Sequence, residues 1–425
     1  MTFFDCTPDH PLDSDFVRRL KSALEAEDES TVTDLLCTEI KHVNATIELS
    51  NDDWMKAPSA QLHPLVLVGL WSLEYKRELT TPLCIAASHG HTACLRHLLF
   101  WRADPNAVPG GRSALHEACE GGHTDCTELL LEHKANPSLL SDEGLAPLHL
   151  CTSQNTLGCA KALVKYGALV DQQSEDTQET PLHIAAKHSL PDHALLYLRY
   201  GAIVDKKNSQ VETALSIACR EAKKLEDQES YLQICRLLIK YGADVNTTDE
   251  EEKRPLHKAC KNANHSLVQI LLQNKADVNA IDYNGSSPLS CTLQTAAFKQ
   301  EMRPHITVQT LLNHGSQKIW PGAFVKVLRS CASVPEIIEI LFNSYSQIQI
   351  SEKWVEAIPE EAFQEHLSFY ESIFSQQCSV RCLQHLCRSA IRKKFGSKCH
   401  YFIPLLPVPK PLQNYLLLKP EGILL

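Results

Sequence analysis

The hydrophobic and polar positions follow their clearest pattern between Thr180 and Asp205, in TPLHIAAKHSLPDHALLYLRYGAIVD. The fixed φ of Pro181 suits a first helical position, and the Thr180 hydroxyl can accept from the free amides of that turn. Small apolar residues continue the helix, the sequence at Pro191 interrupts it, and a second helix follows up to Gly201, a typical helix end. The stretch predicts a pair of short helices, which can bury its apolar side only against copies of itself.

Copies of this helix pair recur along the chain. Each opens with a Pro-Leu or Ala-Leu step, at Pro82, Ala114, Pro147, Pro181, Ala214, Pro255 and Pro288. The intervals between them are 32, 33, 34, 33, 41 and 33 residues. Ankyrin repeats have a period of about 33 residues, and both TPLHIAA and the later GADVN run resemble their pattern. The resemblance implies an all-α fold, a solenoid with seven regular units in residues 81–316.

Two units depart from the regular length. The long interval results from the polar residues Ala222–Ser230, AKKLEDQES, which are inserted between the two helices of unit five. In unit seven, Phe298–His305 lengthens the same turn. Inserted residues in solenoids generally emerge on one face, which is often the binding face.

Weaker helical patterns flank the array. Before it, Phe16, Leu20 and Leu24, and then Val32–Leu36, predict two short helices. We expect residues 1–80 to form an N-terminal cap and a degenerate repeat, closed by a hairpin that includes Trp71–Glu78. Residues 317–373 are predicted to form a divergent helix pair, before a separate module in residues 374–425. The apolar positions of that pair are Phe324, Val327, Leu328, Ile337, Ile340 and Leu341.

Repetition explains most cysteines and several histidines. Two positions of the repeat hold three cysteines each: Cys94, Cys126 and Cys159, and Cys119, Cys219 and Cys260. Because isoleucine, leucine or alanine takes these positions in other units, we expect thiols that pack as small hydrophobic groups, without disulfides, as in a reducing cytosol. A third position holds His116, His149, His183 and His257. This repetition predicts hydrogen bonds between neighbouring units rather than a catalytic base or a metal ligand.

Composition narrows the function classes further. The chain carries 51 acidic and 41 basic residues, a net charge of −10, which gives no reason to expect nucleic-acid binding. Its first residues lack a basic and apolar leader, and its longest apolar stretches, such as Pro64–Trp71, are too short to cross a bilayer. We therefore expect a soluble protein without a membrane partner or a cofactor, in the cytoplasm, with the nucleus as a second location.

The end of the chain has a different charge. Residues 378–425 contain eight Lys or Arg residues and a single acid, Glu421. A basic tail can be a nucleic-acid arm, but no stacking aromatic residues are interleaved with this basic run. We expect a solvated basic helix face instead.

The apolar residues of this tail carry a more specific pattern. Leu383, Cys387 and Ile391 are four residues apart and form one stripe of a helix, which Gly396 would end. The following Leu406–Leu416, LPVPKPLQNYL, begins with an extended segment that its prolines enforce, after which a short helix can start. Together these two elements resemble a SOCS box. With the array before it, the chain resembles the ankyrin repeat and SOCS box family over essentially its whole length.

The resemblance implies roles for these residues. The first helix of a SOCS box binds elongin C, itself paired with elongin B, so Leu383, Cys387 and Ile391 are the expected anchors, with Cys387 small enough to enter a pocket. The segment that resembles the selector of cullin-5 contains Leu406, Pro407, Pro409, Leu412, Tyr415 and Leu416, with Val408 where the family often has leucine. The array would hold a protein substrate, and the tail would hold the elongins, cullin-5 and its RING partner. The chain would then be a non-catalytic adaptor for ubiquitination and proteasomal degradation, which acts by raising effective concentration.

Other interpretations stay open at this point. Zinc could bind in the group Cys378, Cys382, His385, Cys387, Cys399 and His400, although the chain has no Cys-x-x-Cys pair. The tail could instead cap a plain ankyrin scaffold, and would then bury its apolar stripe. No phosphate loop or hydrolase motif is present, so a catalytic role would need an unrecognised cysteine.

Two asparagines suggest a modification. Ankyrin hairpin asparagines are substrates of an oxygen-dependent asparaginyl hydroxylase, with an aliphatic residue just before and a leucine eight residues before. Asn246 fits this pattern through Val245 and Leu238, and Asn279 fits it as well. We favour Asn246, because the insertion in unit five should ease local opening. The alternative is that both are ordinary turn asparagines.

Overall fold

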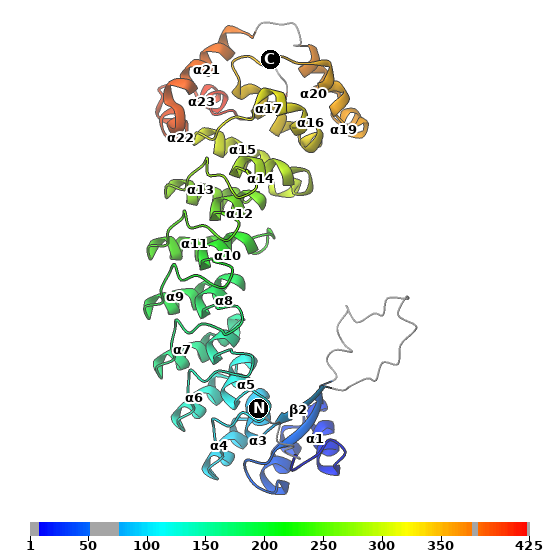
Figure 1. Ribbon diagram of the computed structural model, residues 1–425, viewed down its shortest axis with the longest axis vertical. Helices are drawn as coiled ribbons and strands as arrows, with labels where there is room; N and C mark the ends of the chain where they lie inside the picture. Colours follow the sequence, from blue (N-terminus) through cyan, green and yellow to red (C-terminus); the bar gives the residue numbers. More distant parts are fainter. Residues whose placement is uncertain (1–7, 52–75, 376–380, 423–425) are drawn as a thin grey trace. The chain divides into compact units, whose positions relative to one another are not determined.

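The structure is a computed structural model, and it describes residues 8–51, 76–375 and 381–422. Contacts divide the chain into two compact units, Met1–Ile203 and Val204–Leu425. The described residues are mostly helical (Figure 1), which confirms the predicted all-α class. The apolar stretch Pro64–Trp71, and the predicted hairpin at Trp71–Glu78 up to residue 75, lie outside the described residues. No helix in the described part of the chain is long and apolar enough to cross a membrane.

The first unit begins with the two predicted helices and one element that the sequence did not predict. Helix α1, Asp15–Glu25, is followed by α2, Glu29–Asp34, which continues into the π-helical turn η1, Leu35–Glu39. Strand β1, Ile47–Asn51, then pairs antiparallel with β2, Lys76–Thr80. The sequence pattern predicted the helices and a closing hairpin that includes Trp71–Glu78, but not this pair of strands. Ile47 and Leu49 of β1 alternate with polar residues, as in a strand, but Lys76–Thr80 contains one apolar residue and shows no such period.

All seven predicted repeats open at the predicted residue. In the first unit the elements are α3 Pro82–Ser88 with α4 Thr92–Phe100, α5 Ala114–Gly121 with α6 Thr124–Glu132, η4 Pro147–Leu150 with η5 Gln154–Thr156 and α7 Leu157–Lys165, and α8 Pro181–Lys187 with α9 Pro191–Arg199. In the second unit they are α10 Ala214–Glu221 with α11 Gln228–Lys240, α12 Pro255–Lys261 with α13 His265–Gln273, and α14 Pro288–Thr295 with η6 Ala296–Phe298, η7 Gln300–Met302 and α15 Pro304–Asn313. Within each unit the first helices pack in one row and the second helices in another (Figure 1).

The repeated histidines join neighbouring repeats, as predicted. His116 Nδ1 accepts from the Ser113 amide at 3.2 Å, and this leaves Nε2 to donate to the Leu145 carbonyl at 3.0 Å. His149 and His257 make the equivalent bonds to carbonyls of the following repeat, at 2.9 Å and 3.2 Å. Burial lowers the pKa of all three rings, so each stays neutral and can donate and accept at once.

The repeated cysteines pack as small hydrophobic groups, as predicted. The six side chains of the two cysteine positions are completely buried: Cys94, Cys126, Cys159, Cys119, Cys219 and Cys260. All are free thiols.

The two lengthened turns belong to the second unit. The insertion in unit five is shorter than predicted, because α10 ends at Glu221 and α11 already begins at Gln228. Its last three residues therefore extend α11. In unit seven the extra residues run from the last residue of η6 through η7 to the first two residues of α15. The two loops meet, since Gln228 Nε2 donates to Met302 Sδ at 3.2 Å.

After the last repeat the chain stays helical. The predicted divergent pair is α16, Phe324–Cys331, which follows the turn η8, Pro321–Ala323, and α17, Pro335–Ser344. Three further helices follow, α18 Glu352–Ala357, α19 Glu360–Glu365 and α20 Leu367–Ser375. The C-terminal module consists of α21 Leu383–Phe395, η9 Gly396–Lys398, α22 Cys399–Phe402, η10 Ile403–Leu405 and α23 Lys410–Leu416. The domain boundaries drawn at residues 80, 316 and 373 stay predictions.

Candidate functional site

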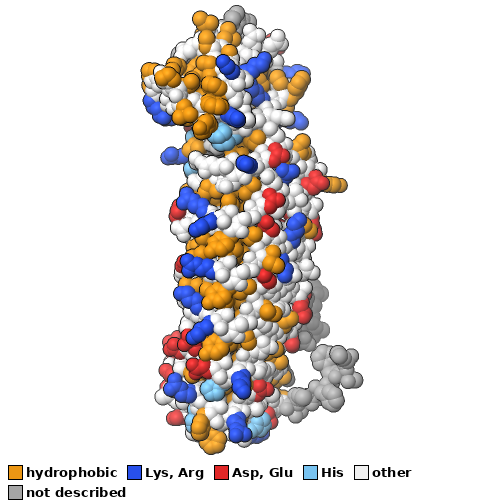
Figure 2. Space-filling view, turned by 90° about the vertical axis from the view of Figure 1, so that its left-hand side faces the viewer, with side chains coloured by type: hydrophobic (Ala, Val, Ile, Leu, Met, Phe, Trp, Pro, Cys, Tyr) orange, Lys and Arg blue, Asp and Glu red, His pale blue; other side chains and the backbone are white. Residues whose placement is uncertain are grey.

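Helix α21 exposes its apolar residues to solvent. The Leu383 side chain is 76% exposed and the Leu386 side chain 36%, and Cys387 and Ala390 are also exposed. Of the stripe predicted from the sequence, Leu383 and Cys387 are exposed, whereas Ile391 is half-buried against the module. From here on, the apolar stripe means the four exposed residues Leu383, Leu386, Cys387 and Ala390. Figure 2 shows hydrophobic side chains gathered over the C-terminal module. A helix that packs on its own protein normally turns such residues inward, so this helix has its apolar side available for another molecule.

The opposite side of α21 is polar and buried. Arg388 is only 4% exposed: its guanidinium stacks on the Tyr415 ring at 4.1 Å and donates to His385 Nδ1 at 2.7 Å. His385, 2% exposed, in turn donates from Nε2 to the Tyr345 carbonyl at 2.7 Å. The prediction of a solvated basic face was therefore wrong for Arg388. Its charge is buried because the Tyr415 ring and the His385 ring nitrogen lie beside it, which the charge pattern alone does not reveal.

Arg392 extends this buried side. Its Nη1 donates to Asn313 Oδ1 at 2.6 Å and to the Leu416 carbonyl at 2.9 Å, and its Nη2 donates to the Leu312 carbonyl at 3.3 Å. This one side chain therefore joins α21 both to α15 and to α23. Of the basic residues on α21, Lys393 and Lys394 are the ones exposed to solvent.

Further polar contacts hold the C-terminal module against the preceding helices. Gln309 and Asn313 of α15 both donate to the Leu417 carbonyl, at 2.9 Å and 3.0 Å. The buried carboxylate of Glu339 on α17 accepts from two amides of the chain end, Glu421 at 2.8 Å and Gly422 at 3.0 Å. Burial raises the pKa of Glu339. The module is thus fixed to the array through its polar side, which leaves the apolar stripe free.

The remaining sequence-predicted residues divide into packed and exposed groups. Leu416 is buried in a small core with Cys399 and Ile403, and Ile391 and Leu406 pack around it. Tyr415 lies half-buried beneath Arg388. Pro407, Pro409 and Leu412 face solvent. Sequence analysis did not single out Leu405, which is 65% exposed next to this segment.

The residues of the alternative zinc site do not converge. Cys382 and Cys387 are exposed, whereas Cys399 lies in the core of the module and His385 is bonded to Tyr345. Cys378 lies outside the described residues. Within the ranges that the structure describes, no group of three His, Cys, Asp or Glu side chains could hold a metal ion.

The two hairpin asparagines connect neighbouring hairpins. Asn246 Nδ2 donates to the Lys275 carbonyl at 3.2 Å, and its Oδ1 accepts from the Asp277 amide at 2.9 Å. Asn279 makes the equivalent two bonds, at 3.2 Å and 2.8 Å. Asn246 also accepts from Arg254 Nη1 at 3.4 Å. Both side chains are engaged in the closed hairpin, as ordinary turn asparagines would be.

His385 makes the attachment of the module sensitive to pH. Burial, opposed by its bond to Tyr345 and reinforced by Arg381, Arg388 and Lys318, lowers the pKa of His385 from 6.5 to about 4. In the unfolded chain this ring has a pKa near 6.5 and takes up a proton more readily than in the folded protein. The stabilisation from the neutral ring is therefore complete above pH 6.5 and is lost as the pH falls towards 4.

We expect the free energy of local opening of α21, measured by hydrogen exchange, to be about 2 kcal/mol lower at pH 5 than at pH 7. In His385→Gln this pH dependence should flatten, because the titrating group is gone. An equally steep profile in the variant would show that another group causes it.

Comparison with known proteins agrees with this architecture. Ankyrin repeats match residues 83–176, 169–249 and 225–319, and a SOCS box matches residues 379–417. Human ankyrin repeat and SOCS box protein 18 is 54% identical over 465 residues, covering 100% of this chain and 100% of that protein. Human ankyrin repeat and SOCS box protein 16 is 39% identical over 354 residues, covering 83% and 77%. A crystal structure of the human ASB11 ankyrin repeat domain is 26% identical, with a TM-score of 0.46, and covers 53% of this chain and 97% of that chain.

A narrower assignment, to ankyrin repeat and SOCS box protein 4, also suggests itself from the sequence pattern. The similar proteins do not support it, since relatives with 54%, 39% and 44% identity are proteins 18, 16 and 10. The repeats, the SOCS box and a relative of 54% identity along the whole chain agree with one another, and the chain belongs to the ankyrin repeat and SOCS box family.

Proposed function

We propose that this chain is the substrate-recognition adaptor of a ubiquitin ligase built from elongins B and C, cullin-5 and a RING protein. The observation that carries the proposal is the orientation of α21. Its apolar stripe faces solvent, while Arg388 and Arg392 hold its other side against the protein. A helix that only capped the array would bury the stripe, so the exposed stripe favours the adaptor over the plain scaffold.

Each part of the C-terminal module has a place in this function. Leu383 and Cys387 would enter a pocket of elongin C, and the half-buried Ile391 would complete the contact at its edge. Cullin-5 would meet the exposed members of the second segment, Pro407, Pro409 and Leu412. Leu406, Tyr415 and Leu416 would set the shape of that segment from within the module.

The chain itself would form no covalent bond. The repeats would hold a protein substrate, and the module would bring it to the charged ubiquitin carrier on the RING protein, which raises the effective concentration of substrate lysines. The abundance of buried free thiols supports a reducing compartment such as the cytoplasm for this activity.

Replacing Leu383 by aspartate tests the proposal. We expect the affinity of the full chain for the elongin B/C pair to fall about thirtyfold or more, roughly 2 kcal/mol, because a charge would enter an apolar pocket. Isothermal titration of purified proteins measures this loss, and recovery of cullin-5 in co-purification should fall with it. The control is Gln384→Asp, which places the same charge on the next exposed residue, outside the stripe.

If Leu383→Asp binds the elongin B/C pair with wild-type affinity and its circular dichroism is unchanged, the apolar stripe is not part of the interface. If wild-type protein binds no elongin at all, the scaffold interpretation becomes the better one.

We also propose that Asn246 is hydroxylated by an oxygen-dependent asparaginyl hydroxylase, ahead of Asn279, because the insertion in unit five should ease local opening. The hairpin must open for the side chain to reach an enzyme, and the additional contact from Arg254 opposes this opening at Asn246. Arg254→Ala should therefore raise the modified fraction of Asn246 severalfold, as measured by peptide mass spectrometry from cells that overexpress the hydroxylase. Asn279 in the same digest is the internal control, and no modification of either asparagine in wild type or variant would contradict the proposal.

A further inference from the structure

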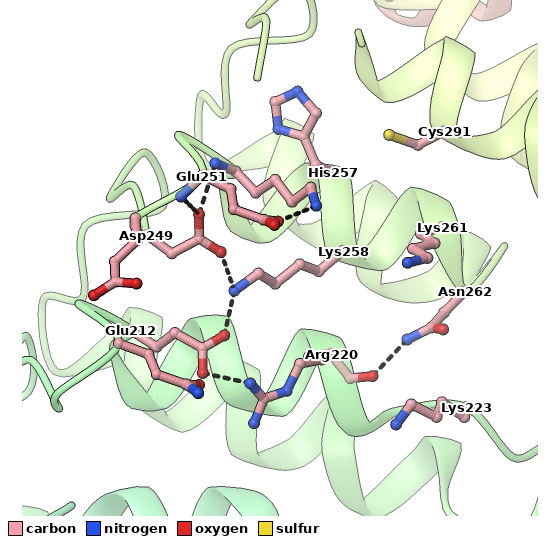
Figure 3. Close-up of a pocket in the computed structure, with 13 residues that line it drawn as sticks. Glu212, Arg220, Lys223, Asp249, Glu251, His257, Lys258, Lys261, Asn262 and Cys291 are labelled. Carbon is pink, nitrogen blue, oxygen red and sulfur yellow. Dashed lines mark hydrogen bonds and ion pairs between the residues drawn. The ribbon is translucent and has the colours of Figure 1, made fainter. Parts of the chain in front are cut away.

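A charged pocket of about 490 Å³ lies in the second compact unit, Val204–Leu425. It is formed mainly by the fifth and sixth repeats, beside their first helices α10 and α12 (Figure 3). At its centre Lys258 Nζ, on α12, lies 2.5 Å from Glu212 Oε1 and 2.7 Å from Asp249 Oδ2. Arg220 also pairs with Glu212, at 2.5 Å. The charges in this part of the pocket neutralise one another, so it offers little attraction to a charged ligand.

The neighbouring edge of the pocket has positive charge in excess. Lys223, Lys261 and Asn262 line this edge, and Lys299 is bonded to Asn262 beside it; we call the three lysines the lysine cluster. Lys299 Nζ donates to Asn262 Oδ1 at 2.8 Å. Asn262 is 5% exposed and is itself fixed by donating to two carbonyls at the end of α10, at 3.0 Å and 2.9 Å. Lys299 is therefore held in place by a buried side chain.

The cluster lacks enough acids to neutralise it. Lys223 pairs with Glu221 at 3.0 Å, but neither Lys261 nor Lys299 has an ion pair among the described residues. Burial, followed by the charges of Lys223 and Lys261, lowers the pKa of Lys299, and nearby Glu301 only partly opposes this. Free lysines would separate, because like charges repel. Here the fold keeps them together.

The lengthened turns of units five and seven build this edge. Lys223 lies in the first of them and Lys299 directly follows the second turn's η6, while Lys261 ends α12 between them. Each turn also presents an apolar side chain, Leu225 at 52% and Phe298 at 88% exposure. The contact between Gln228 and Met302 joins the two turns. Residues outside the regular repeat thus supply both the positive charge and the apolar surface.

We propose that the lysine cluster, with Phe298 and Leu225 beside it, binds an acidic segment of the protein that this chain presents for ubiquitination. Aspartate or glutamate side chains of the segment pair with Lys261 and Lys299, and an apolar residue of the segment packs on Phe298. Carboxylates match the uncompensated charge, and an apolar neighbour gains from covering an aromatic ring that is otherwise in water. This inference rests on the proposed adaptor function and names the class of its substrate.

Fluorescence anisotropy with the full chain tests the inference. The probe is a short fluorescein-labelled peptide of aspartate, glutamate and leucine, and the comparison peptide has asparagine and glutamine in place of every acid. We expect the acidic peptide to bind at least about tenfold more tightly, and its binding to weaken as sodium chloride is raised. The double variant Lys261→Glu with Lys299→Glu should lose at least about tenfold in affinity.

The matched control is Lys240→Glu with Lys275→Glu. It reverses the charge of two exposed lysines that lie in the same compact unit, Val204–Leu425, but outside the pocket. Equal binding of both peptides, or wild-type affinity in the cluster variant, would overturn the inference. Tighter binding of a short RNA than of the acidic peptide would also overturn it. Elongin binding is measured on the same samples, so that failure of the peptide site is distinguished from failure of the adaptor function.

Discussion

Lys258→Met is expected to lower the free energy of unfolding of the second unit by about 3 kcal/mol or more. The Lys258 side chain is 7% exposed and lies between two carboxylates that are 4% and 11% exposed. Methionine has nearly the same length but no charge, so Asp249 and Glu212 would both lose their lysine partner, while Glu212 would still pair with Arg220. Burying carboxylates without a sufficient counter-charge is costly, because the remaining contacts, such as the two amides that donate to Asp249, replace only part of their hydration.

Urea denaturation followed by circular dichroism measures this loss. Lys261→Met is the control, since this lysine lies one turn further along the same helix, is exposed and forms no ion pair among the described residues. We expect it to change stability by no more than about 0.5 kcal/mol. Equally small effects of both substitutions would mean that Asp249 and Glu212 are well solvated, contrary to the described burial.

Arg392→Met is expected to lower the free energy that holds the C-terminal module against the last repeat by about 3 kcal/mol. The Leu312 and Leu416 carbonyls and the Asn313 amide oxygen would lose a charged donor. The substitution would therefore remove the contacts of this side chain with α15 and with α23 at the same time. Faster hydrogen exchange in α21 and α23, with the repeats unchanged, is the measurement. Lys393→Met, at the adjacent exposed position, should leave exchange as in wild type.

Because Arg392 and the apolar stripe lie on opposite sides of α21, the Arg392 variant should still bind elongins. A variant in which exchange in α21 stays at the wild-type level would show that other contacts, such as those of Glu339, suffice to hold the module.

The repeats could be predicted from the sequence because their signals are local. Each first helix begins at a Pro-Leu or Ala-Leu step, which in five of the seven repeats follows a serine or threonine suited to cap it, and Gly201 and Gly396 end helices with a positive φ. Repetition also identified the histidine and cysteine positions correctly. A residue that recurs at one place of a repeat has the same neighbours each time, so packing and hydrogen bonding were the right roles to infer for these residues.

The sequence did not show which side of α21 is buried. The apolar stripe suggested a packed or bound side, and the basic residues suggested a solvated one. Arg388 and Arg392 instead find their partners far along the chain, at Tyr415, Asn313 and backbone carbonyls. His385, Arg388 and Arg392 are three and four residues apart, which places them on one side of a helix, but only the tertiary contacts show what this side faces. Strands β1 and β2 were missed for the same reason, since each is stabilised by its distant partner.

The central claim is that the apolar stripe of α21 is the surface that elongin C covers. The most direct test is the alkylation of Cys387 by N-ethylmaleimide in the full chain, with and without saturating elongin B/C, read by peptide mass spectrometry. Cys387 is exposed, whereas Cys399 is 1% exposed and serves as an unreactive internal reference. We predict rapid alkylation of the free chain and at least about tenfold slower alkylation in the complex. Equal rates at Cys387 with elongin B/C bound would place the interface elsewhere and contradict the claim.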